Sequence, residues 1–161
     1  MLKRIQSLSL KNSDARFAIV ASQYNAQFVD SLLRGAQAEL RQAGAAKVEV
    51  MRVPGAYEIP VVAAYLAAHR HPALAAIICL GVIIRGETAH AQLIGEAVSQ
   101  ALAHIQITYL IPVIHEVLLL ENEAQARARC LDKEHNRGRE AAQTALVMAK
   151  VMRKLKGESQ L

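Results

Sequence analysis

Aromatic residues are scarce in this chain: they make up 4% of its 161 positions, and tryptophan is absent. Proteins that bind single-stranded nucleic acid stack the bases on aromatic side chains, so the shortage argues against that class in spite of a net charge of +5. The densest basic segment, residues 150–156, ends a helical pattern, where lysine favours the negative end of the helix dipole and stays solvated. We therefore expect no nucleic-acid partner.

Cysteine is also rare, and Cys79 and Cys130 show no metal-type spacing, which indicates a reduced protein without disulfides. No apolar run approaches the roughly 20 residues that span a bilayer. The first ten residues lack the apolar core of a signal peptide. No histidines and acids recur at the spacing of a metal site. We expect a cytoplasmic protein with no membrane contact and no bound metal.

Strand patterns alternate with helical patterns along the whole chain. Strands that alternate with helices imply right-handed βαβ crossovers and a parallel sheet that is covered on both faces. The sequence thus predicts one α/β domain over residues 1–161, a three-layer flavodoxin-like sandwich with a four-stranded parallel sheet and an extended N-terminal arm at 1–13. The expected strands are 16–22, 47–53, 74–84 and 107–120 (interrupted by Pro112), and the expected helices follow Asn25 and cover 59–66, 91–105, 121–131 and about 139–156.

The most informative segment is 81–90, Gly-Val-Ile-Ile-Arg-Gly-Glu-Thr-Ala-His, where an apolar strand gives way to a helix. Ligands of open α/β sheets bind beyond the carboxyl ends of the strands. Backbone donors of Glu87 and Thr88 at a helix start suit an anion. His90 can accept and return protons near neutral pH, although a single histidine is often structural.

The other strand ends carry further candidates, each with a plainer alternative. Tyr24 offers a flat face for a heterocycle, or is a rim tyrosine. Glu58, in the segment 53–60, offers a carboxylate to hydroxyls or amines, or complements the helix dipole. His115 lies in the last strand pattern, and Arg129 on the next helix suits bidentate phosphate binding or is merely solvated.

Three segments in this order resemble one family: 53–60 (Val-Pro-Gly-Ala-Tyr-Glu-Ile-Pro), 80–90 and 125–138. From about residue 14 to 152 the chain resembles lumazine synthase, the enzyme of riboflavin biosynthesis that makes 6,7-dimethyl-8-ribityllumazine. The resemblance implies that 5-amino-6-(D-ribitylamino)uracil condenses with 3,4-dihydroxy-2-butanone 4-phosphate, that phosphate leaves, and that no metal or organic cofactor takes part.

The resemblance also implies roles for individual residues. His90 would shuttle protons, and the phosphate of the butanone substrate would be held by Glu87, Thr88 and Arg129. In this family the site lies between neighbouring subunits, so His115 and Arg129 would reach a neighbour's pocket, and the chain would form pentamers, decamers or 60-subunit shells. The ribitylaminouracil would contact Tyr24, Ala56, Tyr57, Glu58, Val82, Ile83, Ile84 and His115.

The chain departs from the family at several positions. His115 stands where phenylalanine is usual, Glu116 where glycine is usual, Arg137 where lysine is usual, and 118–120 (Leu-Leu-Leu) replaces more polar residues. His115 and Glu116 favour an alternative, a non-catalytic flavin- or lumazine-binding or shell-forming protein of the same fold. A flavodoxin-like electron carrier would need a phosphate loop after the first strand, and residues 22–25 contain no glycine.

Overall fold

The computed structural model describes residues 9–10, 14–45 and 47–157. Most of the predicted arm at 1–13 lies outside the described residues, so the arm stays a prediction. Leu10, which is described, is buried, and its backbone N–H donates to the carbonyl of Ala43 at 2.6 Å. No helix in the described part of the chain has both the length and the apolar character needed to cross a membrane.

Four parallel strands form the sheet, in the order β2-β1-β3-β4. They are β1 (Arg16–Ser22), β2 (Lys47–Val53), β3 (Ala76–Ile84) and β4 (Val113–Leu120). The chain moves from β1 outward to β2 and then returns to lay β3 on the other side of β1. The order therefore reverses between β1 and β3, which is where a crevice opens at the carboxyl edge of such sheets.

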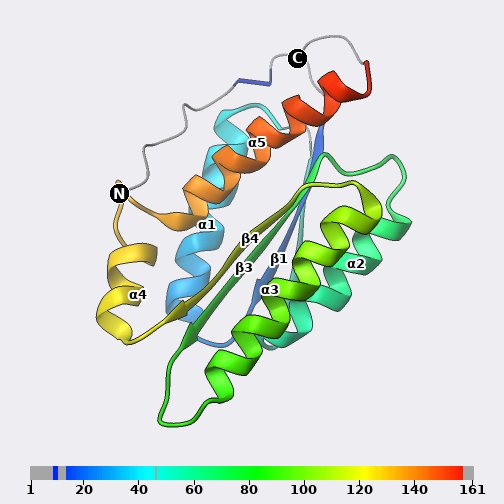
Figure 1. Ribbon diagram of the computed structural model, residues 1–161. Helices are drawn as coiled ribbons and strands as arrows, with labels where there is room; N and C mark the ends of the chain where they lie inside the picture. The colour runs from blue at the N-terminus through cyan, green and yellow to red at the C-terminus, as the bar shows by residue number, and fades with distance from the viewer. Residues whose placement is uncertain (1–8, 11–13, 46, 158–161) are drawn as a thin grey trace.

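Helices cover both faces of the sheet (Figure 1). One face carries α1 (Ala26–Gln42), α4 (Glu123–Cys130) and α5 (Arg137–Leu155), and the other carries α2 (Ile59–His69) and α3 (His90–Tyr109). Residues 17–21 of β1 are fully buried, with alternate side chains in the two apolar cores, as expected of a strand that is covered on both sides. The predicted three-layer α/β fold with a four-stranded parallel sheet is confirmed.

Several predicted bounds differ from the structure. The expected strand at 107–120 begins only at Val113, because residues 107–109 complete α3. Leu110 then adopts a left-handed backbone with φ 50°, which ends the helix, and Pro112 lies just before the strand. The helix at the C-terminal end begins earlier than expected, at Arg137, because the Asn136 side chain accepts the backbone N–H of Arg139 and caps it.

Helices α1 and α5 approach closely where α5 carries a glycine. A Cβ atom built on Gly138 would lie 1.9 Å from the carbonyl oxygen of Leu32, a distance that no side chain can occupy. Nearby, the Gln143 amide donates to the Glu39 carboxylate at 3.2 Å in a buried contact between the same two helices. This side of the sandwich depends on a glycine at position 138.

We predict that Gly138→Ala destabilises the protein by about 3 kcal/mol, because the backbone of α1 must move away from the new methyl group. The measurement is the midpoint of denaturant unfolding. Gly86→Ala is the control, since a Cβ atom there meets nothing within 4 Å, and it should change stability by less than about 0.5 kcal/mol. Equal effects of the two substitutions would contradict this view of the α1–α5 packing.

Candidate active site

A cavity of about 660 Å³ opens at the carboxyl ends of β1, β2 and β3. Its position matches the reversal of strand order described above. Its walls are mostly apolar, and the polar groups among them come from separate segments of the chain. Of the residues that the sequence predicts for the site, those lining the cavity are Tyr24, Ala56, Tyr57, Glu58, Val82, Ile83, Ile84 and His90.

Hydrogen bonds from the loop after β1 hold the cavity in shape. The backbone N–H of Tyr24 donates to the carbonyl of Pro54 at 3.0 Å, which ties this loop to the end of β2. The side-chain amide of Asn25 donates to the carbonyl of Val82 at 2.8 Å, which ties it to β3. Asn25 precedes α1 as predicted, but its side chain caps no helix N–H; its left-handed backbone, with φ 57°, turns the chain here instead.

The second wall is built around a glycine. A Cβ atom on Gly55 would lie 2.9 Å from Glu58 Oε2 and 3.1 Å from the Tyr24 ring, so a side chain at this position would displace both. Without one, the Gly55 N–H donates to Glu58 Oε2 at 2.8 Å. Glu58 is thus held at the cavity wall by its own loop, which fixes where its carboxylate faces a ligand.

The third wall begins with His90, the first residue of α3, whose exposed side chain lines the cavity. The preceding loop is anchored to the end of β4 by Arg85, whose backbone N–H donates to the Leu120 carbonyl at 2.8 Å and whose side chain pairs with Glu121 at 3.2 Å. Glu87 and Thr88 are exposed on this loop and do not line the cavity. The loop presents them beside it, near the start of α3.

Two predicted site residues lie away from the cavity of their own chain. His115 is on β4, the strand at the edge of the sheet, and Arg129 is exposed on α4. Arg127 on the same helix pairs with Glu123 at 3.6 Å, whereas no ion pair of Arg129 is found among the described residues. The single chain therefore brings eight of the predicted residues together and leaves these two on other surfaces.

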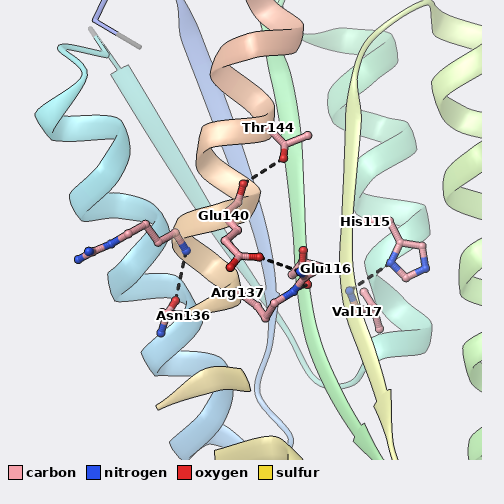
Figure 2. Close-up of polar contacts among 8 residues, drawn as sticks. His115, Glu116, Val117, Asn136, Arg137, Glu140 and Thr144 are labelled. Atoms are coloured by element: carbon pink, nitrogen blue, oxygen red, sulfur yellow. Dashed lines mark hydrogen bonds and ion pairs between the residues drawn. The ribbon is translucent and has the colours of Figure 1, made fainter. Parts of the chain in front are cut away.

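Sequence reasoning missed the role of Glu116. Its side chain is 6% exposed. Arg137 Nε donates to it at 2.8 Å, and Arg137 also donates to Glu140 at 2.7 Å. Figure 2 shows this group on one side of β4 and His115 pointing away from it. Burial raises the pKa of Glu116, and the charge of Arg137 opposes that rise. Successive strand residues face opposite ways, so the alternation itself could have separated His115 from Glu116.

Within the described residues, no three histidine, cysteine, aspartate or glutamate side chains gather as a metal site would require. A reaction without metal or cofactor stays a prediction. The polar groups at the cavity are one imidazole, one carboxylate, a side-chain amide and two phenols. Such a set can orient a polar heterocycle and transfer protons.

Comparison with known proteins identifies the family. The model of the 6,7-dimethyl-8-ribityllumazine synthase family matches residues 14–153. The chain belongs to this family. It is 42% identical to the 6,7-dimethyl-8-ribityllumazine synthase of Stenotrophomonas maltophilia (strain R551-3) over 144 residues, which cover 88% of this chain and 91% of that protein. The synthase of that name from Kineococcus radiotolerans is 39% identical, with 86% of each chain covered. The one from Xanthomonas campestris pv. campestris (strain B100) is 38% identical, with 89% and 93% covered. The predicted family is confirmed.

We predict that Arg137→Ala costs about 3 kcal/mol of stability at pH 7, because it leaves the Glu116 carboxylate buried without its main partner. Removing the cation raises the pKa of Glu116 further. A group whose pKa is higher in the folded than in the unfolded protein stabilises the fold at pH values below its unfolded pKa. This contribution is lost as the pH rises through its folded pKa. The loss should therefore shrink as the pH falls toward the ordinary range of glutamate. Urea unfolding at several pH values measures it.

The matched control is Arg127→Ala, which breaks an exposed pair and should cost less than about 1 kcal/mol at every pH. A loss at Arg137 that does not change with pH would show that the ion pair is not its cause.

Proposed function

We propose that the cavity at the ends of β1, β2 and β3 is where this chain binds 5-amino-6-(D-ribitylamino)uracil and condenses it with 3,4-dihydroxy-2-butanone 4-phosphate. The family makes the chain an enzyme of riboflavin biosynthesis with 6,7-dimethyl-8-ribityllumazine synthase activity. One observation supports placing the reaction in this cavity: its walls include residues from four separate segments, at 24, 56–58, 82–84 and 90.

The cavity suits a ribitylaminouracil. Its volume of about 660 Å³ lies within the range typical of small-molecule sites. The Tyr24 ring supplies a flat face for the pyrimidine, and the backbone of Ala56 and Tyr57 with the anchored Glu58 supplies polar contacts for its substituents. Val82, Ile83 and Ile84 form the apolar floor.

The chemistry needs orientation and proton transfer more than activation of the nucleophile. The substrate amine attacks the ketone, an imine forms with loss of water, phosphate leaves, and the ribityl-bearing nitrogen closes the second ring on the remaining carbonyl with loss of a second water. Holding two partners in place can supply several kcal/mol of the barrier. His90 accepts and returns the protons. Phosphate departs toward the backbone donors of Glu87 and Thr88 and toward Arg129, whose positive potential stabilises the leaving charge.

The site is completed by a neighbouring subunit. His115 and Arg129 lie outside the cavity of their own chain, and the face formed by α2 and α3 is unusually apolar. Tyr57, Val61 and Tyr65 are 63%, 70% and 59% exposed at four-residue steps, and Leu93 on α3 is 62% exposed. Apolar patches of this kind mark protein interfaces. We propose a pentamer at minimum, in which one subunit brings His115 and Arg129 to the cavity of the next.

The non-catalytic alternative loses part of its support. Glu116, one of the two residues that favoured it, faces the other side of β4, where Arg137 donates to its carboxylate at 2.8 Å. The deciding experiment mixes both substrates with the protein and follows lumazine fluorescence. We expect formation faster than the spontaneous reaction; tight lumazine binding with a rate equal to the uncatalysed control would establish the binding protein instead.

The compartment is proposed on chemical grounds. Cys79 and Cys130 are both buried and free. Burial raises the pKa of the Cys130 thiol to about 11, so it is unreactive at neutral pH. These features suit a reduced cytoplasm.

We predict that sedimentation finds a pentamer or a multiple of it, and no stable monomer of 17.5 kDa at working concentration. Val61→Asp, which places a charge in the apolar α2–α3 face, should shift the protein toward smaller species. Leu155→Asp is the control, because Leu155 is as exposed but lies at the end of α5. A monomer that is fully active would refute the shared site.

We predict that His90→Ala lowers kcat by about 100-fold, because proton transfer is lost, while the KM values change less. Orientation leaves some residual activity. His104→Ala on the same helix is the control. Steady-state kinetics measure both, and an unchanged kcat in the His90 variant would remove this residue from the mechanism.

We predict that Arg129→Ala raises the KM for the butanone phosphate by at least about tenfold, the usual loss for a charge-assisted hydrogen bond, with little effect on the KM for ribitylaminouracil. Arg127→Ala, two residues earlier, controls for the loss of charge. If both variants behave alike, Arg129 does not bind the phosphate.

A further inference from the structure

Both ring nitrogens of His115 are engaged inside the chain. The backbone N of Val117 lies 3.2 Å from Nδ1, a contact drawn in Figure 2. Nε2 lies 2.8 Å from the hydroxyl oxygen of Ser99, which comes from α3. That hydroxyl lies 2.7 Å from the carbonyl oxygen of Gly95.

These three contacts have a single consistent assignment of hydrogens. A backbone N–H can only donate, so Nδ1 must accept and carries no proton. The imidazole proton is then on Nε2 and is donated to Ser99. The serine hydroxyl hydrogen is donated to Gly95, whose carbonyl can only accept. One fixed donor and one fixed acceptor at the two ends of the chain of contacts thus determine the tautomer of the ring.

The surroundings also disfavour a charged ring. A proton on Nδ1 would point at the Val117 N–H, and partial burial lowers the pKa of His115. Glu116 lies on the opposite face of β4 with Arg137 and Glu140. On the α3 side, the ring is hydrogen-bonded to the hydroxyl of Ser99, which donates in turn to the carbonyl of Gly95, and neither group is charged.

We propose that Ser99 is a positioning residue that holds His115 as a fixed Nε2–H imidazole, so that the ring meets the uracil of the neighbouring site by its flat face alone. Because both ring nitrogens already form hydrogen bonds within the chain, the ring has no polar atom free to bond a ligand. The ring thus offers only its flat face, as does the phenylalanine that is usual at this position in the family. The inference rests on the proposed function, because it takes ribitylaminouracil as the molecule that the ring covers.

The first test compares two replacements of His115 by calorimetric binding of ribitylaminouracil to the assembled protein. His115→Phe keeps a flat ring and no polar atom, whereas His115→Gln keeps a donor and an acceptor and no ring. A stacking role predicts that the phenylalanine variant binds at least about fivefold more tightly than the glutamine variant. Tighter binding by the glutamine variant would overturn the inference, because it would show that the edge of the imidazole recognises the uracil.

The second test measures the protonation of the two ring nitrogens directly and does not depend on enzyme activity. Solid-state ¹⁵N NMR of the histidine-labelled assembly, with His115 assigned by its absence in the phenylalanine variant, should show a bare Nδ1 and a protonated Nε2 at neutral pH. Ser99→Ala should release the ring, so that the cation appears at a higher pH than in the wild type and KM for ribitylaminouracil rises about three- to tenfold.

Ser99→Thr keeps a hydroxyl and should restore the wild-type spectrum, and Gln100→Ala, next to Ser99 and exposed, is the control. Mixed tautomers in the wild type, or a Ser99→Ala spectrum identical to it, would overturn the inference. The two hypotheses fail separately: a protein that binds as described but forms no lumazine refutes the proposed function alone, whereas lumazine formation with tighter binding by His115→Gln refutes the inference alone.

Discussion

The site depends on the way the end of β1 is tied to its two neighbours. Tyr24 donates a backbone hydrogen bond to the carbonyl of Pro54 beyond β2, and the Asn25 side chain donates to the carbonyl of Val82 on β3. These two bonds hold three chain segments that are distant in sequence around one opening. Without these bonds, nothing would fix the positions of Tyr24, the Glu58 loop and residues 82–84 relative to one another. The orientation on which the proposed catalysis relies would then be lost.

Much of this architecture could be predicted from the sequence because its signals are local. The apolar run of β3 and the turn before His90 identify a strand end and a helix start, and a parallel sheet brings all such ends to one edge. Local signals were insufficient at 107–110, where the apolar residues fit the end of a helix as well as a strand, and the left-handed turn at Leu110 has no clear sequence mark. The bond from Asn25 to Val82 joins residues 57 positions apart, so no local pattern could reveal it.

The departures at 115, 116 and 137 are a similar case. In the sequence, His115 and Glu116 are neighbours, and both favoured the non-catalytic alternative. In the structure they face opposite sides of β4: Glu116 forms a buried ion pair with Arg137, so two of the unusual residues compensate each other, and His115 faces α3. The pair spans 21 positions between two elements and could be found only from the fold. Two residues proposed for the site, His115 and Arg129, lie away from the cavity of the single chain.

The most direct test of the account is a structure of the assembled protein with ribitylaminouracil and inorganic phosphate bound. We expect the heterocycle in the cavity between Tyr24 and a neighbour's His115, with phosphate between the loop before His90 and that neighbour's Arg129. If His90 and the nearest Arg129 of the oligomer lie more than about 10 Å apart, no single pocket could hold both reactants in position, and the shared site would be contradicted.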